Sequence, residues 1–142
     1  MMPLLLLLTV SSVMTGVIWV IQLLVYPNFS MISKKEFGSF HDKHMKKISV
    51  IVMPVMLIEL GLTVIVTINY FYTNISKLVL MNSLLLAIIW LSTVFIQVPH
   101  HKELKRHYSK EFVSILVSFN WLRTIAWTAK TIVIIAIILG LE

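Results

Sequence analysis

The sequence predicts an all-α integral membrane protein, a bundle of four membrane-spanning helices that forms one domain over residues 1–142. Hydrophobic residues make up 58% of the chain and charged residues only 13%, whereas soluble domains carry about 25% charged residues. The apolar residues also fall into four long runs, and short polar segments separate these runs.

The first two runs cover about residues 3–26 and 48–72, and a helix needs roughly 17–25 apolar residues to cross a bilayer. The first run has no basic start and no small-residue cleavage site, so we expect a retained span rather than a signal peptide. We expect its helix to end at Tyr26-Pro27-Asn28, because proline cannot continue a helical hydrogen-bond ladder. The polar segment at residues 33–47 is predicted to be a loop, and Pro54 lies inside the second run.

The other two runs cover about residues 78–98 and 112–139. A short turn at residues 73–76 precedes the third run, and Pro99 is expected to end the third helix. The polar segment at residues 100–110, predicted to be a second loop, leads into the fourth helix.

Positive charge is concentrated in these two polar segments. The formal net charge is +6, and the segments hold nine of the twelve Lys and Arg residues. Cytoplasmic loops of membrane proteins are enriched in Lys and Arg, and four spans place both segments on one side. We therefore expect cytoplasmic loops and external termini in a bacterial inner (plasma) membrane. The basic excess indicates topology, and no nucleic-acid partner is expected.

A short pattern recurs in the two halves of the chain. Tyr26-Pro27 followed by Lys35-Glu36-Phe37-x-Ser39 resembles Val98-Pro99 followed by Lys110-Glu111-Phe112-x-Ser114. A duplicated helical hairpin would produce such a recurrence.

All five histidines lie in the two basic segments. His41 and His44 are three residues apart and share a helix face, while His100 and His101 follow the third run. Because imidazole is the commonest metal ligand, we predict a metal site formed by His41, His44, His100 and His101. The alternative is that these histidines only add polarity at the membrane interface.

Polar and aromatic residues recur at helical spacing along the first, third and fourth runs, and in a membrane bundle such stripes face inward. The cofactor-binding residues predicted from them are Trp19, Gln22, Trp90, Gln97, Asn120 and Trp127. The alternative is that hydroxyl and amide groups only join the helices and that tryptophan marks the membrane interface.

Glu59 and Arg123 are ionisable residues inside spans, where a charge costs at least about 2.5–3.5 kcal/mol. Each lies 11 residues beyond the cytoplasmic start of its run, so at 1.5 Å per residue both lie about 16 Å deep. We predict that they form an ion pair, or share a network with Asn120 and Gln97, and that they are the catalytic residues. Lys130 either snorkels to water or points inward. In the second case the cavity suits an anionic guest, such as haem propionates, a lipid phosphate or a carboxylate.

Five motifs together cover nearly the whole chain. They are Trp19-x-x-Gln22-x-x-x-Tyr26-Pro27, Phe40-His41-x-x-His44, Pro54-x-x-x-x-Glu59, Gln97-Val98-Pro99-x-His101 and Asn120-Trp121-x-Arg123-Thr124-x-x-Trp127. They resemble a family of small, uncharacterised bacterial four-span membrane proteins, whose layout is similar to that of anthrone-oxygenase-like domain proteins.

A more distant similarity is to HemJ-type protoporphyrinogen oxidase, carried by Ile48-x-x-Ile51-x-x-Pro54-x-Met56 in the second run and Lys77-Leu78 at the start of the third. This resemblance implies a haem-binding histidine in the first span and Asn-Glu-x-Pro in the last. The chain departs from both features, since its first run has no histidine and its last run has Asn120-Trp121-x-Arg123.

Three classes of function stay open at this point. The first is a metal- or haem-dependent oxidoreductase that acts on a hydrophobic substrate, with Glu59 as proton carrier and Arg123 as substrate anchor. The second is a non-enzymatic small-molecule or lipid binder or transporter, and the third is an accessory subunit of a membrane complex. Expected partners are membrane lipids, a hydrophobic or anionic small molecule, and further subunits in a homo-oligomer or larger complex. The lack of cysteine excludes thiol catalysis.

Overall fold

The computed structural model describes residues 1–141, apart from the side chain of Ser30, and these residues form helices and no strands. Four long helical runs cover Met2–Asn28, Lys34–Tyr70, Ser76–Arg106 and Lys110–Leu139. They have 27, 37, 31 and 30 residues, and each is long and apolar enough to cross a bilayer. The predicted all-α four-helix bundle is confirmed, and the chain is a multi-pass membrane protein.

The first run consists of α1 (Met2–Val20), a π-helical segment (Ile21–Val25) and α2 (Tyr26–Asn28). A 3₁₀ turn (Phe29–Met31) follows this run. The second run is the single helix α3 (Lys34–Tyr70). The third consists of α4 (Ser76–Ser92), a second π-helical segment (Thr93–Gln97) and α5 (Val98–Arg106), and the fourth is α6 (Lys110–Leu139).

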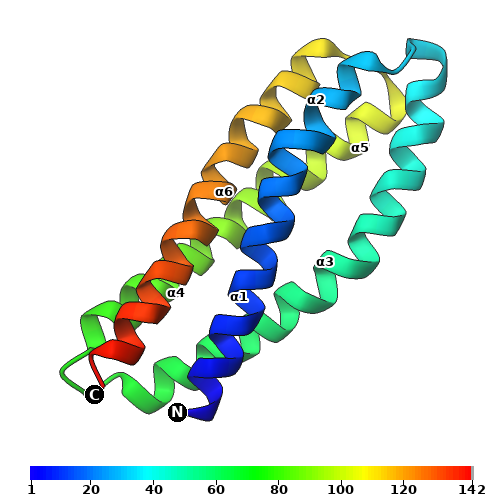
Figure 1. Cartoon of the computed structure of the whole chain (residues 1–142). Coiled ribbons are helices and arrows are strands. Elements are labelled where there is room, and N and C mark those ends of the chain that lie inside the picture. The colour runs from blue at the N-terminus through cyan, green and yellow to red at the C-terminus, as the bar shows by residue number, and fades with distance from the viewer. Residues whose placement is uncertain (142) are drawn as a thin grey trace.

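Each long helix packs against two neighbours. α1 and α4 both contact α3 and α6, so α3 and α6 face each other across the bundle. The two termini lie at one end, which we call the terminal end, and the connections at residues 29–33 and 107–109 lie at the other (Figure 1). We call the second the basic end, because both lysine-rich segments are there.

The polar segments are largely helical, and the prediction of two long loops is wrong. α3 begins at Lys34, before the apolar run, and α5 continues to Arg106. Phe37 lies inside the first segment and Leu104 inside the second, and both pack with Phe29 in a buried cluster. This apolar contact at the basic end stabilises the helices beyond the lipid-facing part of the bundle.

Pro99 does not end the third helical run as predicted, although the first run does end at Asn28. Pro27 and Pro99 each lie two residues after a π-helical segment, in a run that continues as helix. The i→i+5 bonds of the π-helical segment interrupt the α-helical ladder just before the proline, which would otherwise break that ladder. π-Helical segments often occur at functional sites, and both of these contribute a glutamine to the site described below.

The interior changes character along the bundle. Aliphatic side chains fill the terminal end, where Leu4, Leu7, Val66 and Ile134 are fully buried. Aromatic side chains dominate the basic end. Between these clusters, buried polar side chains form two layers, one around Glu59 and one around Arg123.

Candidate functional site

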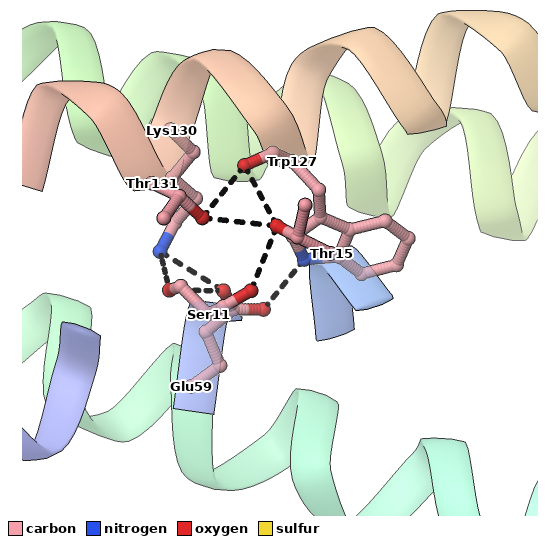
Figure 2. A network of polar contacts seen from close by, with 6 residues as sticks. All are labelled: Ser11, Thr15, Glu59, Trp127, Lys130 and Thr131. Carbon is pink, nitrogen blue, oxygen red and sulfur yellow. Dashed lines mark hydrogen bonds and ion pairs between the residues drawn. The ribbon is translucent and has the colours of Figure 1, made fainter. Parts of the chain in front are cut away.

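The layer nearer the terminal end is a closed hydrogen-bond network around Glu59 (Figure 2). Glu59 and Lys130 are fully buried, and Oε1 of Glu59 lies 3.0 Å from Nζ of Lys130. The Ser11 hydroxyl donates to Glu59 Oε1 over 2.7 Å and accepts from Lys130 Nζ over 2.9 Å. Trp127 Nε1 donates to Glu59 Oε2 over 3.0 Å. Both carboxylate oxygens are therefore satisfied, as a buried ion pair requires.

Two threonines extend this network between α1 and α6. Thr15 Oγ1 donates to the carbonyl oxygen of Ser11 and lies 2.9 Å from Thr131 Oγ1. Thr131 in turn donates to the carbonyl oxygen of Trp127 over 3.0 Å. The layer thus holds α1, α3 and α6 in fixed positions relative to one another, because its polar groups form hydrogen bonds with one another.

The predicted ion pair between Glu59 and Arg123 is wrong, because Glu59 pairs with Lys130. The prediction measured depth from the first apolar residue of each run, but α3 and α6 are not level at those residues. Glu59 is level with Trp127 and Lys130, which lie one and two helical turns beyond Arg123. Lys130 therefore points inward and does not snorkel.

The second layer centres on Arg123, which is 8% exposed. Its Nη1 donates to Asn120 Oδ1 over 3.3 Å, and its guanidinium carbon lies 5.2 Å from the centroid of the Trp127 ring, within the range of a cation–π contact. Within residues 1–141, no carboxylate forms an ion pair with Arg123, and its Nε has no hydrogen-bond partner there. Arg123 is thus a buried cation without a counter-charge in the described chain.

The amides of this layer connect the two π-helical segments to α6. Asn120 Nδ2 donates to Gln22 Oε1 over 2.7 Å. Gln97 Nε2 donates to the carbonyl oxygen of Leu116 over 3.3 Å, and its Oε1 accepts from the Tyr26 hydroxyl over 3.2 Å. These bonds position Asn120 and Gln97 beside Arg123, so the predicted polar stripes do meet inside the bundle.

A cavity of about 100 Å³ opens beside Arg123. Polar groups of Tyr26, Gln97 and Arg123 line part of it, and Val52 and Met56 of α3 line an apolar part. His101 lines this cavity and also a groove at the basic end, which Lys102 and Lys105 line as well. The cavity and the groove therefore adjoin, and together they extend from the basic end to Arg123.

The four histidines predicted to bind a metal do not converge. His41 Nε2 and His101 Nδ1 lie 2.9 Å apart and share a hydrogen bond. His44 stacks on Phe40, whereas His100 turns away and its Nδ1 contacts the carbonyl oxygen of Ile96 over 2.7 Å. Among the residues that the structure describes, no three His, Asp or Glu side chains are grouped to hold a metal ion.

Electrostatics at the basic end favour neutral imidazoles. His41 and His101 lie in the polar extensions beyond the apolar runs, and burial lowers the pKa of each ring below its usual value. The neighbouring Asp42 makes ion pairs with Lys105 over 2.6 Å and with Lys46 over 2.8 Å. These two lysines lower the pKa of Asp42 to about 2.

Of the six predicted cofactor-binding residues, Gln97 lines the Arg123 cavity, whereas Trp19, Gln22, Trp90, Asn120 and Trp127 are not among its lining residues. Trp19 Nε1 donates to Thr128 Oγ1 over 3.1 Å and so joins α1 to α6. Trp90 lines a different cavity, between α3 and α4. Ser11, which bonds to both Glu59 and Lys130, was not among the predicted site residues. The spacing of Ser11 and Thr15, one helical turn apart, could have indicated its face.

No protein family, curated protein or solved structure matches this chain. Its function therefore has to be inferred from its own residues.

Proposed function

We propose that this protein binds an amphiphilic small molecule inside the bundle, with the anionic group of the ligand at Arg123 and its apolar part against α3. One observation carries the proposal. Arg123 is buried beside a cavity and, in residues 1–141, has no carboxylate partner. This assigns the protein to the class of small-molecule or lipid binders and transporters.

The charges of the two layers support an anionic ligand. Glu59 and Lys130 compensate each other, so neither neutralises Arg123. A cation inside a span costs at least about 2.5–3.5 kcal/mol, and the cation–π contact with Trp127 offsets only about 0.5–2 kcal/mol of that. A carboxylate or phosphate would complete the site, because the guanidinium fork matches the geometry of either group.

The lining of the cavity supports an apolar tail on the same molecule. The same cavity is lined by four apolar residues of α3, namely Ile48, Val52, Met53 and Met56. Methionine side chains are flexible and adapt to ligands of different shape. A fatty acid or a similar single-chain amphiphile combines these two parts. Because the cavity is only about 100 Å³, it would hold the charged end and the first part of the chain, and the rest of the tail would lie in lipid beside the exposed Met53.

The basic end suits the entry of an anion. Lys102 and Lys105 line the groove that adjoins the cavity, and a positive entrance raises the local concentration of anions. We place this end in the cytoplasm, in a bacterial plasma membrane, because its lysines follow the positive-inside distribution. A C-terminal reporter that reads cytoplasmic would contradict this orientation.

A metal- or haem-dependent oxidoreductase fits these residues less well. The ring nitrogens of His41 and His101 that face each other are joined by a hydrogen bond, and His100 points away. The carboxylate of Glu59, predicted to carry a proton, already accepts from Ser11, Trp127 and Lys130. Among the described residues, these side chains are not arranged around a shared metal or haem position.

Binding of laurate to the full chain in phosphatidylcholine nanodiscs tests the proposal. We expect saturable binding, and at least about tenfold weaker binding of methyl laurate, which lacks the charge. Arg123→Gln should weaken laurate binding to the level of the ester. The matched control is Arg106→Gln, because Arg106 is the other arginine of the chain and is exposed at the basic end. Equal binding of laurate by wild type and Arg123→Gln would refute the proposal.

A further inference from the structure

A second cavity lies between α3 and α4, nearer the terminal end than Arg123. Its volume is about 330 Å³, within the roughly 300–1,000 Å³ of small-molecule sites. Leu60, Val64 and Leu86 form part of its apolar wall, and none of its described lining residues is charged. It shares no described lining residue with the Arg123 cavity.

Two residues of this lining each carry a buried polar atom that has no hydrogen-bond partner among the described residues. These atoms are the hydroxyl oxygen of Thr63, a residue that is 3% exposed, and the indole nitrogen of Trp90. The neighbouring hydroxyls are satisfied, since Thr67 donates to the carbonyl oxygen of Thr63 over 2.8 Å and lies 2.8 Å from Ser83 Oγ. In the hydrocarbon region no water compensates for a missing partner, so the two groups point to a ligand.

The chemistry of these two groups restricts the ligand. An indole N–H can only donate, and a threonine hydroxyl can donate as well, so the ligand has to present a hydrogen-bond acceptor. The uncharged lining excludes an ionic group. Val64 and Ile68 line the cavity and are exposed on the surface of α3, which gives access from the bilayer.

We propose that this cavity binds a neutral, membrane-soluble carbonyl compound whose carbonyl oxygen accepts hydrogen bonds from Trp90 and Thr63. Quinones and the esters of neutral glycerolipids share this chemistry. The site lies apart from Arg123 and does not depend on the function proposed above.

Nuclear magnetic resonance of the full chain in nanodiscs of ether-linked phosphatidylcholine, which has no ester carbonyl to compete with the probes, tests this site. With ¹⁵N-labelled indoles, the four tryptophans give four N–H resonances, and Trp90→Phe identifies that of Trp90. The probes are decylubiquinone and dioctanoylglycerol. We expect at least one probe to shift the Trp90 resonance saturably, while that of Trp19, whose N–H already donates to Thr128, stays in place.

A pair of threonine variants completes the test. Thr63→Val should weaken binding of the active probe about tenfold, whereas Thr9→Val should not, because Thr9 is exposed on α1 and its hydroxyl bonds within its own helix.

The probe that shifts Trp90 identifies the quinone or the ester as the source. Binding that persists in Arg123→Gln separates this site from the laurate site. A Trp90 resonance that neither probe moves, equal shifts of all four indoles, or unchanged affinity in Thr63→Val would overturn the proposal.

Discussion

Removing one charge of the Glu59–Lys130 pair should destabilise the bundle strongly. Glu59→Gln leaves the ammonium group of Lys130 fully buried with only the Ser11 hydroxyl and an amide oxygen as acceptors. Lys130→Met leaves the carboxylate with its bonds from Ser11 and Trp127 but without a counter-ion. Breaking a buried pair from either side costs about 3–5 kcal/mol, so each single variant should lose about that much free energy of unfolding.

The double variant Glu59→Gln/Lys130→Met should be no less stable than either single variant. With both charges removed, no buried ion lacks a partner, and a neutral replacement of a buried pair is often tolerated. The predicted coupling energy is therefore at least about 3 kcal/mol, at the upper end of measured pairs or above it. Reversible unfolding by sodium dodecyl sulfate in mixed micelles measures all four free energies.

The matched control replaces a lysine outside the network. Lys77→Met, at the start of α4, should add to Glu59→Gln within about 0.5 kcal/mol, because the two residues share no contact. Additive effects of Glu59→Gln and Lys130→Met would contradict the predicted coupling, since the ion pair would then contribute nothing to stability.

Two further predictions concern the amide layer and the basic end. Asn120→Leu and Gln22→Leu should each lower the free energy of unfolding by about 1–2 kcal/mol, because each leaves a buried amide without its partner. The double variant should lose less than the sum of the two, and a full sum in the same unfolding assay would contradict their hydrogen bond. Asp42 has a folded-state pKa lowered from 3.8 to about 2, so its contribution to stability is present above about pH 4 and is lost as pH falls toward 2. Asp42→Asn should remove that part of the pH dependence, and an unchanged acid profile in the variant would show that the lysine contacts do not stabilise the fold.

The fold could be predicted from composition and run length because the bilayer leaves few choices. A chain that crosses hydrocarbon has to satisfy its backbone internally, and four apolar runs of this length become four helices. The helical extensions at the basic end were missed because lysine-rich segments between spans were equated with loops. The sequence signal that favours a helix there is the spacing of Phe37 and His41, which lie one helical turn apart. Both side chains are buried in the structure.

The partners of the buried charges could not be predicted from one-dimensional spacing. Arg123 and Lys130 lie two turns apart on nearly the same face of α6, so spacing alone allows either to reach Glu59, although only Arg123 was predicted to pair with it. Which cation pairs with Glu59 depends on the axial offset between α3 and α6. Side chains from three helices, including Ser11 and Trp127, determine this offset. The sequence also predicted a spare positive charge inside the bundle if Lys130 points inward. Lys130 does point inward but pairs with Glu59, and the cation that lines the cavity is Arg123.

The most direct test of an anion site at Arg123 is a solid-state NMR measurement between the ligand and the guanidinium group. The protein would carry ¹⁵N in its two arginines, and the laurate would carry ¹³C in its carboxyl group. If the carboxylate binds at Arg123, a dipolar coupling at hydrogen-bonding distance should join the carboxyl carbon to the Arg123 guanidinium, and this coupling should persist in Arg106→Gln. Saturable laurate binding with no such coupling to Arg123 would contradict an anion site there.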